Sequence, residues 1–96
     1  MIDFNVLKKQ FLVIYCAVKQ YGDSTNNPQL AILEELLAEL DKDNPDVKLL
    51  EELNHSLYPP YAGLSEFFIW DDDFDKRIEL NNPVDNAKRI TWEMLN

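Results

Sequence analysis

Apolar side chains recur at the spacing of an α-helix along most of this chain. Between residues 4 and 21 they stand three or four positions apart, which places them on one helix face: Phe4, Leu7, Phe11, Ile14, Tyr15, Val18 and Tyr21. Other apolar residues lie on the remaining faces, so we expect this helix to be the central one and the Cys16 thiol within it to be buried. Gly22 follows at the position where a left-handed residue commonly ends a helix.

Asn-Pro pairs predict three further helix starts, because proline is favoured at the first helical position and asparagine at the cap before it. They are Asn27-Pro28, Asn44-Pro45 and Asn82-Pro83. Apolar stripes follow each pair: Leu30, Leu33, Leu36, Leu37 and Leu40; Val47, Leu50, Leu53 and Leu57; Val84, Ala87, Ile90 and Met94. Another helix, interrupted near Trp70, is expected over residues 65–80, although residues 67–70 taken alone also fit a short strand.

These patterns predict an all-α fold, a single compact bundle of about five helices that spans residues 1–96. Two glycines are too few for a turn-rich β-domain. A chain of 96 residues makes one domain, and its apolar content of 46% is enough for a packed core.

The formal charge of −9 arises from 18 acidic and 9 basic residues, and the acids are concentrated in the middle of the chain. Residues 1–22 carry +2, whereas residues 23–62 carry −7 and residues 63–81 carry −4. Such a surface repels nucleic acid and anionic lipid, since phosphate binding needs lysine and arginine. It favours a basic protein partner, or it serves solubility alone.

Residue types for catalysis or metal binding are scarce. His55 and Cys16 are the only histidine and the only cysteine, which is too few for a zinc site. Glu52 and His55 match one ligand pair of a di-iron bundle, but such a site needs a second histidine. The acidic run that begins at Asp71 lacks the glycine and glutamate of a calcium-binding EF-hand loop. We therefore expect no enzyme activity, no catalytic residue, no metal and no cofactor.

The sequence predicts a cytoplasmic protein that does not enter a membrane. The N-terminus has an acid where a signal peptide carries positive charge. The apolar run over residues 11–18 is far shorter than the roughly 20 residues of a membrane span. A single thiol is typical of a reducing compartment.

Aromatic residues beside carboxylates mark the candidate partner-binding site. Aromatic side chains that border polar sequence are favoured as interface anchors, whereas Leu64, Phe67 and Phe68 fit better as packing. The predicted contact set is Tyr58, Tyr61, Trp70, Asp71, Asp72, Asp73 and Asp75. A second candidate face, expected to point to water, consists of Glu34, Glu35, Glu39, Asp41 and Asp43.

The second half of the chain resembles a family of small acidic bacterial proteins. Residues 61–74 read Y-A-G-L-S-E-F-F-I-W-D-D-D-F, and residues 80–85 read L-N-N-P-V-D. The family's tails run Gly-Leu-Ser-acid-aromatic-aromatic-aliphatic-Trp and then Asn-x-Pro-Leu-Asp, so Val84 stands where leucine is expected. These proteins look like immunity proteins encoded beside secreted toxins, including those of contact-dependent inhibition systems. The resemblance covers residues 60–96, less than half of the chain.

The resemblance implies an immunity protein that neutralises a cognate bacterial toxin by stoichiometric binding. A toxin that is a nuclease or ribonuclease is basic because it must bind phosphates, and an acidic inhibitor complements that surface. The alternative is a non-catalytic adaptor or regulatory subunit of a cytosolic complex, in which the acids serve only solubility.

Overall fold

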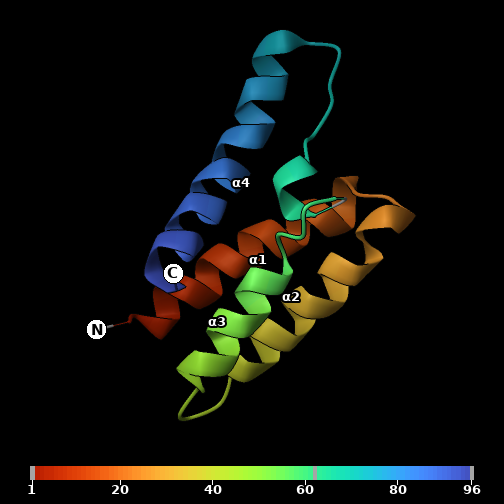
Figure 1. The fold of residues 1–96 in the computed structure, drawn as a ribbon. Coiled ribbons are helices and arrows are strands. Elements are labelled where there is room, and N and C mark those ends of the chain that lie inside the picture. The colour runs from red at the N-terminus through yellow and green to blue at the C-terminus, as the bar shows by residue number, and fades with distance from the viewer. Residues whose placement is uncertain (1, 62, 96) are drawn as a thin grey trace.

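The computed structural model describes residues 2–61 and 63–95, and its regular structure is entirely helical. Four α-helices make up the fold: α1 (Phe4–Tyr21), α2 (Asn27–Leu40), α3 (Val47–Ser56) and α4 (Phe74–Leu95). Two short 3-10 turns, η1 (Ser24–Asn26) and η2 (Leu64–Glu66), lie in the connections (Figure 1). The predicted all-α class is confirmed. The expected number of about five helices is one too high, and residues 67–70 form no strand.

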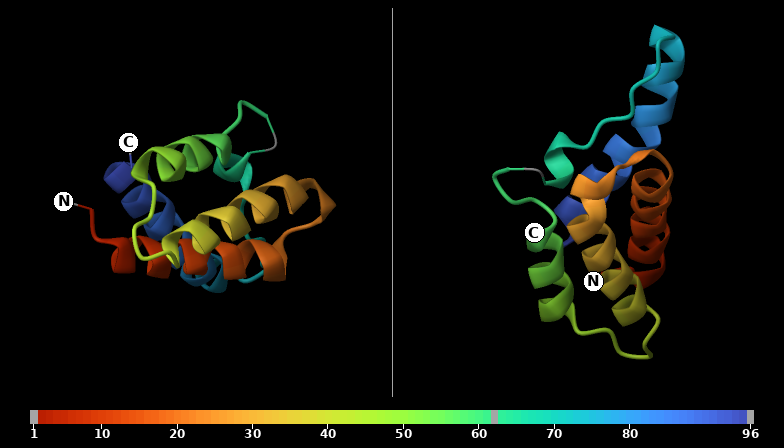
Figure 2. Two further views of the ribbon diagram at one scale, coloured as in Figure 1. Left: turned by 90° about the horizontal axis from the view of Figure 1, so that it is seen from below. Right: turned by 90° about the vertical axis from the view of Figure 1, so that its right-hand side faces the viewer.

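The helices bury their apolar stripes against one another in a single core. Helix α2 lies between α1 and α3 in both views of Figure 2, and α4 packs against α1 and α3. Fully buried side chains from all four helices and from η2 fill the space between them, including Leu7, Phe11, Ile14, Leu33, Leu36, Leu50, Leu64 and Ala87. The hydrophobic effect of this burial is the main stabilising term of such a small domain.

Helix α1 forms the two most extensive helix–helix interfaces, as expected of a central helix, but it is not enclosed on all sides. It packs against α2 and α4, but Val6 and Leu12 on its outer side are 37% and 41% exposed. The Cys16 thiol is also exposed, so the prediction of a buried cysteine is wrong. With only four helices, no element remains to cover this side of α1.

The connection from α1 to α2 needs a glycine for a different reason than predicted. Gly22 has φ −77° and ψ 174°, which is extended backbone and not the left-handed conformation. A Cβ atom at this position would lie 2.5 Å from the Val18 carbonyl oxygen and 2.8 Å from Asn26 Oδ1. The close approach of the chain to the end of α1 therefore excludes larger residues.

Aspartate side chains cap η1 and α3, and the asparagines of the first two Asn-Pro pairs are not the N-cap residues of the helices that follow them. Asp23 accepts a hydrogen bond from the Thr25 backbone N–H and begins η1, which leads directly into α2. Asp46 accepts from the Leu49 backbone N–H at the start of α3, two residues after Asn44. Both helices form close to the predicted starts. Pro28 lies in the first turn of α2, whose N-cap residue is Asn26, and Pro45 stands just before Asp46, the N-cap residue of α3.

The third Asn-Pro pair starts no helix, because α4 continues through Pro83. Proline lacks the N–H that would bond to the carbonyl four residues earlier, which weakens a helix without necessarily ending it. The ring of Pro83 is exposed, whereas the neighbouring Asn81, Val84 and Ala87 are buried against the bundle. Burial of that face holds the helix together across the proline. The predicted helix over residues 65–80 is replaced by η2, an extended segment and the first turns of α4.

Candidate partner-binding surface

The start of α4 and the extended segment before it project beyond the rest of the bundle (Figure 1). The molecule measures 43 × 23 × 20 Å along its principal axes, so it is distinctly elongated. In the extended segment successive side chains alternate between the two sides of the backbone. Phe67 and Ile69 are buried, whereas Phe68 and Trp70 are 57% and 68% exposed. The alternation turns two aromatic rings towards the outside.

The side chain of Asn81 on α4 fastens this extended segment to the helix. Its Oδ1 accepts a hydrogen bond of 2.9 Å from the Ile69 N–H. Its Nδ2 donates to the carbonyl oxygens of Ile69, at 2.9 Å, and Arg77, at 2.8 Å. Farther along α4, Lys88 Nζ donates to the Phe67 carbonyl oxygen at 3.1 Å, and partial burial lowers the pKa of this lysine. Two α4 side chains thus fix residues 67–69 in place.

Four exposed apolar side chains gather on the projecting part, and we call them the apolar tip: Phe68, Trp70, Phe74 and Ile78. Phe74 is 64% exposed and Ile78 is 43% exposed. The guanidinium of Arg77 lies 4.2 Å from the centre of the Trp70 ring and 5.3 Å from that of Phe74, a cation–π arrangement. On α4, one turn apart, Phe74 and Ile78 share a groove of about 320 Å³ with Phe68. Phe74 contacts Arg77 together with Trp70 and also lines the groove with Phe68 and Ile78. It therefore joins the four side chains into one continuous surface.

The acidic cluster, Asp71, Asp72, Asp73 and Asp75, borders the apolar tip. Asp73 accepts hydrogen bonds from the N–H groups of Asp75 and Lys76, and it thereby caps α4. Asp71 accepts from the Asp73 N–H, and its other oxygen lies 3.9 Å from Lys76 Nζ. Asp72 accepts from the indole N–H of Trp70 at 3.3 Å. Three of the four carboxylates therefore shape the turn as well as carrying charge.

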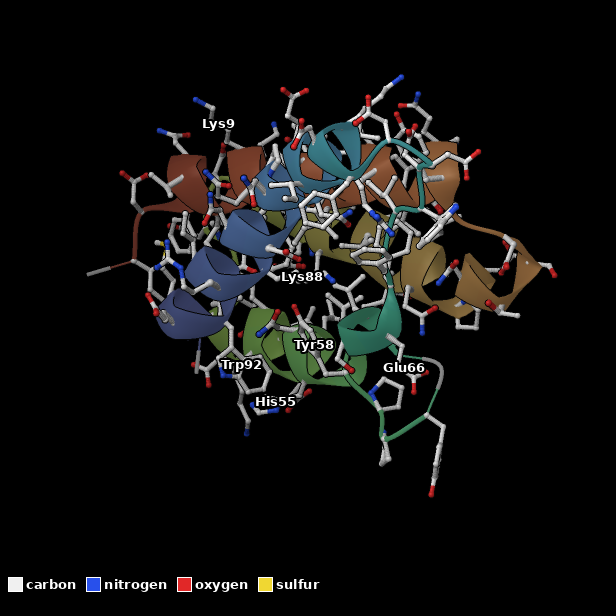
Figure 3. The ribbon with its side chains drawn as sticks, turned by 90° about the horizontal axis from the view of Figure 1, so that it is seen from above. Lys9, His55, Tyr58, Glu66, Lys88 and Trp92 are labelled. Atoms are coloured by element: carbon white, nitrogen blue, oxygen red, sulfur yellow. The ribbon has the colours of Figure 1, made fainter. Side chains whose placement is uncertain are left out.

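Tyr58, the first aromatic residue of the predicted contact set, lies at another part of the molecule. Its ring packs edge-on against Trp92 with 5.1 Å between centroids, and His55 meets the same indole at 5.2 Å (Figure 3). Trp92 is 15 residues beyond Arg77 on α4, or about 22 Å at 1.5 Å per residue. Since Trp70 packs against Arg77, Tyr58 cannot act together with it in one small contact.

Burial gives Tyr58 a packing role. Desolvation raises the pKa of its phenol to about 12. Tyr61 differs, because it is 85% exposed in the loop after α3. The predicted set is therefore split: Trp70 and the acidic cluster lie together, Tyr58 lies elsewhere, and no contact links Tyr61 to Trp70 within the described residues.

The second candidate face is partly neutralised by the protein itself. Glu39 is only 5% exposed, so the expectation that it points to water is wrong. Its carboxylate contacts Lys42 Nζ at 2.8 Å and accepts from the Asp46 N–H at 2.9 Å, and these two contacts lower its pKa. Lys8 pairs with Asp41. Glu34 accepts a hydrogen bond from the Tyr15 hydroxyl, whereas Glu35 and Asp43 are exposed.

Within residues 2–61 and 63–95, no group of three or more His, Cys, Asp or Glu side chains is arranged to hold a metal ion. In the same part of the chain, no helix has the length and apolar character needed to cross a membrane.

Sequence reasoning missed three members of this surface. The sequence pattern predicts that Phe68 packs inside and assigns no role to Phe74 or Ile78, yet all three are exposed. The signal for Phe68 is present in the sequence, since a period of two over residues 67–70 would separate Phe67 and Ile69 from Phe68 and Trp70. An assumed helix over the same residues hid that period.

No protein-family model, curated protein or solved structure matches this chain.

Proposed function

We propose that this chain is a non-catalytic binding protein that engages a basic protein partner through the apolar tip. The observation that carries the proposal is the exposure of Phe68, Trp70 and Phe74 together on a projecting segment that α4 holds in place. Contiguous exposed apolar groups rimmed by polar residues are typical of interaction sites. Tryptophan and other large aromatic side chains supply much of the energy of protein interfaces.

The charge around the apolar tip indicates what kind of partner it takes. Over residues 71–85 there are six acids and two bases, a net charge of −4. A basic partner would be drawn to this end of the molecule, and a phosphate backbone would be repelled. With the resemblance of residues 60–96, this favours an immunity protein that neutralises a toxin nuclease as the specific form of the function.

One observation favours the alternative, an adaptor or regulatory subunit whose acids have no role in recognition. Asp71, Asp72 and Asp73 each make a local hydrogen bond, so their presence has an explanation without any partner. Under this alternative the apolar tip still binds, but the acidic cluster contributes nothing to the affinity or to the rate of association.

Truncation of the apolar tip tests the proposal. The toxin candidate is the product of the gene adjacent to this one, and its binding is measured by titration calorimetry. We expect W70A and F74A each to weaken binding by about 2 kcal/mol, the usual minimum for an interface anchor. Their melting temperatures should hardly change, because both side chains are more than 60% exposed.

Leu12→Ala is the matched control, because it truncates a 41% exposed side chain on α1. Loss of affinity in L12A equal to that in W70A would show that the apolar tip is not the binding site. Full affinity in both W70A and F74A would contradict the proposal directly.

A further inference from the structure

The groove beside the apolar tip combines apolar walls with hydrogen-bond acceptors at one end. Phe68, Phe74 and Ile78 form its exposed apolar lining. Asn82 and Asp85, one and two turns farther along α4 than Ile78, add an amide and a carboxylate. An occupant that fits this lining has a flat or aliphatic body and a terminal group that donates hydrogen bonds.

The carboxylate of Asp85 is available to such an occupant. It makes no ion pair or side-chain hydrogen bond with any described residue, although its charge acts on Lys88 and raises the pKa of that lysine against the effect of burial. The neighbouring Asn81 is not available, because its amide is fully engaged with the backbone of Ile69 and Arg77. Asp85 is therefore the charged acceptor of the groove.

The aromatic rings of the tip already hold one guanidinium. Arg77 lies over Trp70 and Phe74, which demonstrates that these rings suit a planar cation. Arg77 also lines the groove, and its positive charge opposes a second cation there. The six acids and two bases of residues 71–85, Arg77 included, still leave a net charge of −4.

We infer that this groove receives an arginine side chain of the partner, with its stem against Phe74 and Ile78 and its guanidinium paired with Asp85. The inference rests on the proposed function and specifies which group of the basic partner is recognised. Guanidinium has five donors and no acceptor, so the acceptors Asp85 and Asn82 match it. Lysine carries a compact ammonium in place of the planar fork of donors, so it matches these two acceptors less well and is the weaker candidate.

A peptide titration tests the inference without knowledge of the partner. The probe is acetyl-Gly-Arg-Gly-amide, added to ¹⁵N-labelled protein and followed by amide chemical shifts. The comparison peptides carry citrulline, the neutral analogue of arginine, or lysine. We expect saturable shifts at Phe68, Phe74, Ile78 and Asp85 with the arginine peptide and much smaller ones with citrulline.

Asp85→Asn should weaken binding of the arginine peptide by up to about fivefold, the upper end of the effect of an exposed ion pair. Glu35→Gln is the matched control, because it removes an exposed carboxylate from α2 and should leave the affinity unchanged. Equal shifts with citrulline, equal binding by lysine, unchanged affinity in D85N, or shifts confined to residues 71–75 would each overturn the inference.

The same variants separate this inference from the proposed function. If the wild-type chain binds no basic partner, the proposed function fails, while the peptide result stands on its own. Suppose that a toxin binds and W70A weakens that binding, but D85N changes the affinity for neither the toxin nor the peptide. The proposed function then stands, and only the inference that the groove binds arginine is wrong.

Discussion

Replacement of Asn81 by aspartate tests whether one buried amide holds the binding surface in place. The side chain of Asn81 is almost fully buried and makes three hydrogen bonds, one as acceptor and two as donor. Asn81→Asp preserves the shape and the acceptor for the Ile69 N–H. It replaces the donating Nδ2 by an oxygen that faces the carbonyl oxygens of Ile69 and Arg77.

The expected loss follows from those two donated bonds. A hydrogen bond contributes about 1 kcal/mol net, and a buried group left without its partner costs about 1–3 kcal/mol. N81D should therefore destabilise the fold by about 2–4 kcal/mol at neutral pH. For a domain of this size each kcal/mol lowers the melting temperature by roughly 4–8 °C. Asn81→Ala should lose a similar amount, since it removes all three bonds.

The pH dependence separates the two variants. In N81D the facing carbonyl oxygens and burial favour the protonated carboxyl, so its folded-state pKa is raised above the unfolded value of about 3.9. Below that unfolded pKa the carboxyl donates a hydrogen bond in place of the amide, and most of the lost stability returns. As the pH rises through the folded-state pKa, this stability is lost again. The deficit of N81A relative to wild type should not vary in this way.

Urea unfolding at a series of pH values, followed by the shift of the midpoint, measures both effects. Amide chemical shifts of residues 67–70 report in the same samples whether the extended segment has left α4. The role assigned to Asn81 would be refuted if N81D unfolded at the wild-type urea midpoint at neutral pH. It would also be refuted if the midpoint of N81D lay below that of wild type by the same amount at every pH.

Three other outcomes follow from the fold and its charge. Pro83→Ala should stabilise α4 by up to about 3 kcal/mol in thermal melts, because it restores a helix N–H at an exposed position, and a destabilised variant would contradict a continuous helix. Glu39→Gln should lower the free energy of unfolding near neutral pH, because Lys42 and a backbone N–H stabilise the Glu39 carboxylate and depress its pKa below 4.5. The difference in stability from wild type should vanish as the pH falls through that lowered pKa, and a difference that stays constant with pH would argue against the ion pair. Raising the salt concentration should slow association with a basic partner and leave dissociation nearly unchanged in stopped-flow measurements. Association rates that do not vary with salt would show that charge attraction plays no part in recognition.

The fold class and the first three helices could be predicted because local signals and packing agree there. The apolar stripes of α1, α2 and α3 lie on the faces that the core buries, and these helices start within about two residues of the expected positions. The signal around Pro83 failed because an Asn-Pro pair fits both a helix start and an exposed site within a helix. Tertiary burial of Val84 and Ala87 decides between them, and no local pattern contains that information.

The candidate site was predictable only where exposure could be read from the neighbouring residues. Trp70 stands next to four aspartates within five residues, and it is exposed as expected for an interface anchor. Tyr58 stands next to prolines, yet it packs on Trp92, a residue 34 positions away in the sequence. The partner of Tyr58 depends on how α3 and α4 meet, so sequence spacing alone could not exclude it from the contact set.

The acidic cluster illustrates why a structural and a functional role need not compete. Asp71 and Asp73 form the turn and the cap that begin α4, and this local order fixes where Trp70 and Phe74 point. Asparagine caps a helix about as well as aspartate but carries no charge. Either residue type would therefore serve as the cap at position 73, and the aspartates at positions 71 and 73 add like-charge repulsion to the cluster. Lys76, at 3.9 Å from Asp71, and the positive end of the α4 dipole both act against that repulsion. Under the proposed function a basic partner would add positive charge here, which is the physical reason for proposing its contact at this end of the molecule.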